Sequence, residues 1–108
     1  MDRWRPINLD DLECLVDKQL LSCSPDQQLL FEEYRVPFYH RPINRMGKIE
    51  LVYVVAWLGD EALYYEDIED GFELGRPDAE GIIPSRGGNQ YELRHLLGRI
   101  QSNNRGLT

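Results

Sequence analysis

The densest group of chemically capable side chains in this sequence is a cluster of carboxylates that follows a predicted strand. Glu66, Asp67, Glu69 and Asp70 lie within five consecutive positions directly after Tyr65. Their oxygens suit a hard cation or a basic protein surface, but the spacing lacks the alternating acids, central glycine and terminal glutamate of a calcium-binding EF-hand loop. We predict no metal and no cofactor. Two interpretations stay open: a solvated acidic edge, or a partner-binding surface formed by the four acids and Tyr65.

A glycine-rich segment provides the second candidate site. Arg86, Gly87 and Gly88 precede a predicted helix, where backbone N–H groups and the arginine charge can bind an anion. The segment lacks the lysine of a P-loop and the glycine fingerprint of a dinucleotide site. A plain connection into the helix is the stronger interpretation. The loop Arg86 to Asn89 is the alternative site for an anion, a small molecule or the substrate of a small enzyme.

Histidines and cysteines form no recognisable catalytic motif. His40 and His95 are the side chains best suited to shuttle protons near neutral pH, yet no Gly-x-Ser-x-Gly motif, His-x-x-x-His motif or activated cysteine accompanies them. Cys14 and Cys23 lie nine positions apart, outside any CxxC or zinc-binding array, so two thiols without a redox role are expected. We predict no catalytic residues and favour a binding protein over an enzyme.

Charge and hydropathy disfavour two classes of partner. The 108-residue chain has a formal net charge of −7, and residues 60–80 hold nine acids against Arg76 alone. An electrostatic field of this sign repels phosphate backbones and argues against nucleic-acid binding. The longest apolar run, Val54 to Leu58, is far shorter than the roughly 20 residues that cross a bilayer, and no secretory signal precedes Trp4. We expect a cytoplasmic protein without membrane contact, possessing a basic protein partner.

Helical spacing and capping residues mark three segments. Asn8 caps a predicted helix over residues 9–20, and a Ser-Pro-Asp-Gln capping box begins a second helix over residues 25–34. Asn89 to Glu92 repeats the signature of a cap followed by glutamate and predicts the start of a third helix. The apolar stripe of this helix consists of Leu93, Leu96, Leu97 and Ile100. Residues 102–108 are polar and are predicted to form a disordered tail.

The middle of the chain alternates in the manner of β-strands. Residues 35–43 contain two prolines, which cannot donate to a central ladder and indicate a sheet edge. Residues 49–58 are apolar on both faces, as expected of an interior strand covered at least in part on both sides. Two shorter apolar pieces, residues 71–74 and 81–83, flank a turn-rich insert and are compatible with another hairpin.

A tight turn sets the expected register of the central hairpin. Gly59 and Asp60 fit a two-residue turn with positive φ at the glycine. This turn places Val54 opposite Tyr65, and it leaves either Tyr64 or Tyr65 on the less well covered face of the sheet. An exposed tyrosine beside carboxylates is a common anchor for a protein partner.

These elements predict one α+β domain over residues 1–101, followed by the tail 102–108. The expected order is ααββββα: an antiparallel sheet of four to five strands, two N-terminal helices and one C-terminal helix, with the helices mainly on one face. A homodimer and a monomer are equally compatible with the sequence.

The run from Val54 to Phe72, with Asn89-Gln90 and Glu92-Leu93 downstream, resembles a group of small uncharacterised bacterial proteins. The resemblance extends over the last two-thirds of the chain. It implies a bacterial origin and a single domain, and it implies no activity and no site residue. From the residues themselves we predict a non-enzymatic protein-binding module, immunity-like or adaptor-like, whose acidic edge contacts a basic partner.

Overall fold

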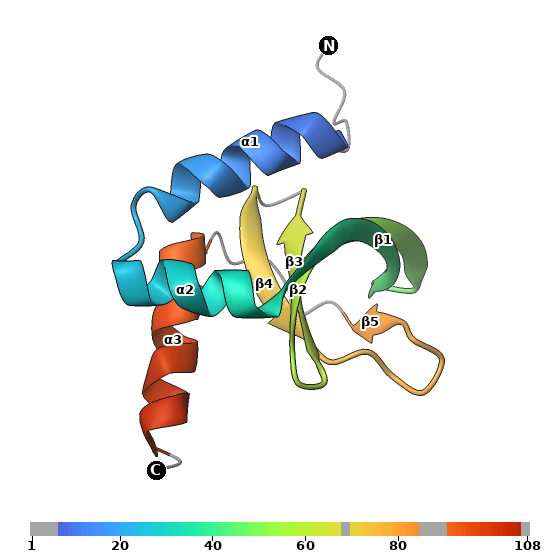
Figure 1. Cartoon of the computed structure of the whole chain (residues 1–108). Helices are drawn as coiled ribbons and strands as arrows, with labels where there is room; N and C mark the ends of the chain where they lie inside the picture. Colours follow the sequence, from blue (N-terminus) through green and yellow to red (C-terminus); the bar gives the residue numbers. More distant parts are fainter. Residues whose placement is uncertain (1–6, 68–69, 85–90, 107–108) are drawn as a thin grey trace.

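Two helices, a curled sheet and a final helix follow one another along the chain (Figure 1). The computed structural model describes residues 7–67, 70–84 and 91–106. The elements are α1 (Leu9–Leu20), α2 (Pro25–Tyr34), β1 (Arg35–Arg45), β2 (Lys48–Leu58), β3 (Glu61–Glu66), β4 (Gly71–Gly75), β5 (Ile83–Pro84) and α3 (Leu93–Gly106). They form one compact α+β domain, which confirms the predicted fold class. No helix within the described ranges has both the length and the apolar character needed to span a membrane.

Short-range contacts fix the first two helices. The Asn8 side chain accepts a hydrogen bond from the Asp11 N–H at 2.8 Å and so caps α1. At the start of α2, Ser24 Oγ accepts from the Gln27 N–H at 3.2 Å, and Gln27 Oε1 accepts from the Ser24 N–H at 3.0 Å. This reciprocal pair is the predicted capping box. The bounds of both helices agree with the sequence prediction because these contacts join residues three positions apart.

The sheet has five strands in the order β4-β3-β2-β1-β5. β1 to β4 pair antiparallel with their neighbours in the chain, whereas β5 pairs in parallel with β1 at Ile43 and Asn44. The predicted hairpin between residues 71–74 and 81–83 is therefore wrong, since these strands pair with β3 and β1 instead. β1 is an edge strand only over the part that β5 leaves uncovered, so the edge prediction holds in part.

Tight turns join β1 to β2 and β2 to β3. Gly59 has a φ of 68°, the positive value expected of the predicted two-residue turn. In the turn between β1 and β2, Met46 has a φ of 53° and Gly47 a φ of 88°. Left-handed backbone at both positions is typical of a type I′ hairpin turn. A side chain such as that of Met46 destabilises this conformation by about 1–2 kcal/mol.

A bulge in β2 changes which tyrosine faces which side of the sheet. Val54 pairs with Tyr64, and Val55 is an extra residue before the next pair. The prediction that Val54 lies opposite Tyr65 is therefore wrong by one residue. Tyr64 and Tyr65 are 1% and 5% exposed, so neither one is the exposed aromatic anchor that the sequence suggested.

Each face of the sheet has its own hydrophobic core. The helices cover one face, and Figure 1 shows them grouped together while β1 arches away from them. Their core contains Leu12, Val16, Phe31, Val55, Leu63, Tyr65, Phe72, Leu93, Leu96 and Leu97, among others. A smaller core lies on the opposite face, inside the curl of the sheet. It consists of Ile43, Val52, Val54, Ala62, Tyr64 and Ile83.

The sheet curls until its two outer strands approach each other. β4 and β5 stand at opposite ends of the strand order, yet a Cβ atom added to Gly75 would lie 2.7 Å from Ile83 Cγ2. The same Cβ would lie 3.1 Å from Tyr64 Cε1. Ile83 thus closes the smaller core from the β5 side, and the absence of a side chain at position 75 permits the approach.

α3 begins at Leu93, later than a cap at Asn89 implies. Tyr91 forms a β-bridge with Phe72 and its carbonyl accepts from the Phe72 N–H at 2.8 Å. This extended pairing prevents a helix from including Tyr91, while Asn89 lies outside the described residues. α3 continues to Gly106, so its backbone enters the segment 102–108 that the sequence predicted as a tail.

Candidate functional site

Glu66, the first acid of the predicted cluster, is part of an internal ion-pair network. Its side chain is 6% exposed and pairs with Arg45, whose Nη1 also lies 2.8 Å from Glu50 Oε1. Loss of hydration by itself lowers the pKa of Arg45, but the hydrogen bonds to Glu50 and Glu66 outweigh it and raise the pKa. The bond from Arg45 lowers the pKa of Glu50. This triad joins the ends of β1, β2 and β3.

The neighbouring acids hold the chain before α1 and the turn after β3. Asp67 is 7% exposed, and its Oδ2 accepts from the Ile7 N–H at 2.9 Å. Asp70 is exposed, and its Oδ1 accepts from the Tyr65 hydroxyl at 3.2 Å. Burial, followed by the charge of Asp70, raises the pKa of Tyr65 to about 12. Glu69 lies outside the described residues.

The predicted partner-binding surface is thus mostly used inside the fold. Of its described members, Asp70 is exposed, whereas Tyr65, Glu66 and Asp67 are buried. The sequence could not reveal this, because the partners Arg45 and Ile7 lie far away along the chain.

The candidate anion site lies outside the described residues. Arg86, Gly87, Gly88 and Asn89 all fall between residues 84 and 91, where the structure describes no placement. The prediction for this loop therefore stays a prediction. Elsewhere, no group of three or more His, Cys, Asp or Glu side chains is placed to hold a metal ion in the part of the chain that the structure describes.

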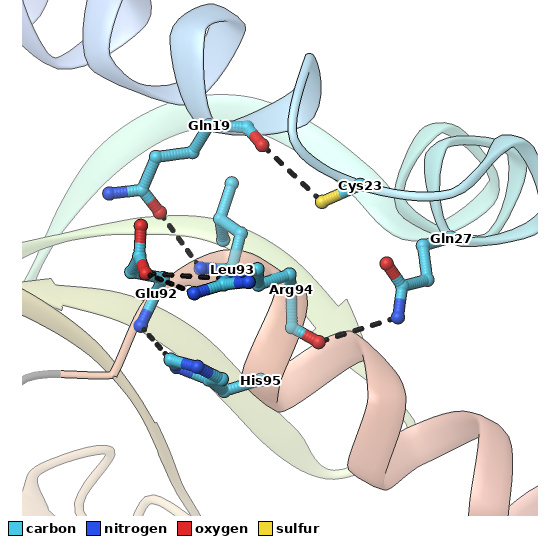
Figure 2. Close-up of polar contacts among 7 residues, drawn as sticks. All are labelled: Gln19, Cys23, Gln27, Glu92, Leu93, Arg94 and His95. Carbon is cyan, nitrogen blue, oxygen red and sulfur yellow. Dashed lines mark hydrogen bonds and ion pairs between the residues drawn. The ribbon is translucent and has the colours of Figure 1, made fainter.

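The two histidines have separate roles. His95 Nδ1 accepts a hydrogen bond from the Glu92 N–H at 3.1 Å, as Figure 2 shows. It thereby occupies the position that a glutamate or glutamine has in a capping box. His40 on β1 packs against Tyr53 on β2, with 4.0 Å between the ring centroids. Among the described residues, the contacts of His40 and His95 include no serine or cysteine that could act as a nucleophile.

Polar side chains of α1 and α2 hold the first turn of α3 (Figure 2). Gln19 Oε1 accepts from the Leu93 N–H at 2.8 Å, which satisfies one of the free N–H groups at the helix start. Gln27 Nε2 donates to the Arg94 carbonyl at 3.4 Å, and Cys23 Sγ donates to the Gln19 carbonyl at 3.4 Å. Burial raises the pKa of the Cys23 thiol, and the charge of Arg94 offsets only part of this. The contacts of Gln19 and Gln27 join α1 and α2 to the start of α3.

The hairpin of β1 and β2 carries exposed hydrophobic side chains at its far end. Met46, Ile49 and Leu51 are 104%, 52% and 56% exposed. Ile49 and Leu51 alternate on one face of β2, opposite Asn44 and Pro42 in register. We call Met46, Ile49 and Leu51 the hairpin surface. Side chains of this kind, clustered and exposed, are typical of protein interfaces.

The sequence does not distinguish the hairpin surface from a buried strand. The apolar pattern predicts β2 as covered on both faces, and this holds from Val52 to Ala56, apart from half-buried Tyr53. The first part of the predicted strand is not covered, because Ile49 and Leu51 remain exposed. The reason is tertiary: the hairpin arches past the helices, so that the core on their side reaches only as far as Tyr53.

A cleft lies between the first half of α1 and the start of β1. Its volume is about 230 Å³. The residues that line it are Leu9, Glu13, Arg35, Val36, Pro37 and Phe38. The register of β1 against β2 is interrupted between Arg35 and Tyr39, so the middle of this segment departs from regular pairing beside α1.

Residues of the cleft and of the hairpin surface share the helix-bearing face of the sheet, while Val36 in the cleft packs against the opposite core. Phe38 in the cleft and Tyr53 both pack against the helix-side core. Tyr53 stacks on His40, and the pair of Pro42 and Leu51 follows along the hairpin. A path of apolar and aromatic side chains therefore extends from the cleft to the hairpin surface.

Comparisons with known proteins found no relative. No protein-family model, no curated protein and no solved structure matches this chain. The resemblance to small bacterial proteins stays a prediction.

Proposed function

We propose that this protein is a non-enzymatic binding module that contacts a basic protein partner. The observation that carries the proposal is the hairpin surface, Met46, Ile49 and Leu51, which exposes three large apolar side chains on one hairpin. Covering them in an interface removes apolar area from water, which is the main driving force for protein association.

The charge of α1, which lines the cleft, supports a partner of basic character. Asp10, Asp11 and Glu13 are all exposed in the first half of α1, next to the cleft that Glu13 lines. The whole chain has a formal net charge of −7. Such a field steers a basic protein toward the surface and makes the association rate sensitive to salt.

The sequence also predicted a protein-binding module, but it placed the contact surface at the acidic edge and not on the hairpin. Glu66 and Asp67 make contacts inside the fold. The carboxylates of α1 are therefore the acids expected to contact a basic partner. Apolar side chains of the hairpin replace Tyr65 as the expected anchors, because interface cores are apolar and their rims polar.

The test uses a random peptide library displayed on phage. We expect selected sequences to combine Lys or Arg with apolar residues and to bind more weakly as salt increases. The variant Ile49→Ser/Leu51→Ser should lose this binding. A matched control, Leu21→Ser/Leu29→Ser, changes leucines that are 83% and 70% exposed elsewhere and should keep it.

Equal binding by the two double variants, or selection of sequences without basic residues, would overturn the proposal. A homodimer that depends on Ile49 and Leu51 would also do so, since it would assign the hairpin surface to a second copy of the chain. Sedimentation equilibrium of the wild-type protein and of Ile49→Ser/Leu51→Ser measures this.

A further inference from the structure

We infer that the cleft between α1 and β1 binds the side chain of a lysine or arginine supplied by the protein partner. The inference rests on the proposed function and names the contact by which the acidic helix would recognise a basic surface. Three features support it: the size of the cleft, the apolar side chains that line it, and the ion-pair partners of its charged residues.

The cleft has the size of a side-chain site. Its volume is about 230 Å³, below the roughly 300–1,000 Å³ of sites that enclose whole small molecules. Four of its residues, Leu9, Val36, Pro37 and Phe38, offer apolar contact. The methylene stem of a lysine or arginine can pack against such walls while its charged end stays in contact with water.

The charges of the cleft favour a cation. Arg35 lines it, but Arg35 Nη1 lies 3.2 Å from Glu32 Oε1, and this ion pair offsets its charge. The Arg35 guanidinium is also positioned by the rings of Phe31 and Phe38, whose centroids lie 5.5 and 5.2 Å away. The Glu13 carboxylate makes no hydrogen bond or ion pair with another side chain or backbone group in the described ranges, and Glu13 is exposed. Its carboxylate is left available to an incoming ammonium or guanidinium group.

A matched set of small probes tests the inference directly. The probes are capped lysine, capped norleucine and capped glutamate, each blocked as an N-acetyl methylamide, and binding is followed by amide chemical shifts in two-dimensional NMR. We expect capped lysine to shift the amides of Leu9, Glu13, Val36 and Phe38 in a saturable manner. Capped norleucine has a similar length without the charge, and capped glutamate carries the opposite charge.

The decisive variant is Glu13→Gln, which preserves shape and removes the charge. We expect the variant to lower the affinity for capped lysine about two- to fivefold, as for a partly exposed ion pair. The affinity for capped norleucine should not change. Asp17→Asn is the control, because Asp17 is an exposed carboxylate of the same helix that does not line the cleft. It should bind capped lysine as the wild type does.

Several results would overturn the inference: shifts that map away from the cleft, equal binding of capped lysine and capped glutamate, or an unchanged lysine affinity in Glu13→Gln. The variant Ile49→Ser/Leu51→Ser separates this test from that of the proposed function, since it should still bind capped lysine. If peptides require the hairpin surface but capped lysine does not bind, the cleft inference alone fails. If capped lysine binds but no peptide is selected, the partner proposal alone fails.

Discussion

The closure of the sheet depends on a glycine, and Gly75→Ala tests it. The new Cβ would lie 2.7 Å from Ile83 Cγ2 and 3.1 Å from Tyr64 Cε1. Both neighbours are rigid: Ile83 is fully buried and branched at Cβ, and the Tyr64 ring is 1% exposed. Neither atom is the end of a flexible side chain, so the backbone of β4 or β5 must shift to accommodate the methyl group.

Two opposing terms determine the size of the effect. Forcing a methyl group into a packed core destabilises by about 1–3 kcal/mol. Replacing glycine by alanine at a compatible backbone position stabilises by about 0.4–1 kcal/mol through the unfolded state. The middle values leave a net loss of about 1–1.5 kcal/mol, which lowers the melting temperature of a domain of this size by about 4–6 °C.

Thermal and urea unfolding measure this loss, and Gly98→Ala is the control. A Cβ at Gly98 would lie 3.5 Å from Gln27 Nε2, an ordinary contact, and Gly98 lies within α3. Its replacement should raise stability by about 0.5–1 kcal/mol through helix propensity. In a protein that already carries Ile83→Ala, the atom Ile83 Cγ2 is absent, so Gly75→Ala should destabilise the fold much less. A wild-type melting temperature for Gly75→Ala would refute the contact between the two outer strands.

Three further predictions concern the turn, a tyrosine and the thiols. Met46→Asn should raise the free energy of unfolding by about 1 kcal/mol, because asparagine tolerates the left-handed backbone better; an unchanged or lower melting temperature would contradict this. Burial and the charge of Asp70 raise the pKa of Tyr65 to about 12, so the stability linked to its neutral phenol is complete below about pH 10 and declines as the pH rises toward 12. The free energy of unfolding, measured with urea, should fall more steeply between pH 10 and 12 for the wild type than for Tyr65→Phe. The same decline in both proteins would contradict the link between stability and the pKa of Tyr65. Cys14 is exposed, whereas Cys23 is 7% exposed with a raised pKa, so a thiol reagent should modify one site quickly and the other slowly. Cys14→Ser should remove the fast phase, and two equal phases in the wild type would contradict the burial.

The elements that the sequence determined by itself are those held by neighbours in the chain. α1 and α2 begin at caps whose hydrogen bonds connect residues three positions apart, and Gly59 bends the chain at the turn between β2 and β3. Apolar residues at helical spacing mark the side of α1 and of α3 that faces the core. These local terms are enough to predict the α+β class and the bounds of the first two helices.

Tertiary structure alone decided the features that depend on distant residues. The bulge at Val55 moved Tyr65 to the helix side. Asp67 is buried because it binds the Ile7 N–H, 60 positions away along the chain. The exposure of Ile49 and Leu51 follows from the path of the hairpin past the helices. A carboxylate or an apolar side chain has the same local pattern whether it is covered or not, since coverage is set by elements that approach only when the chain folds.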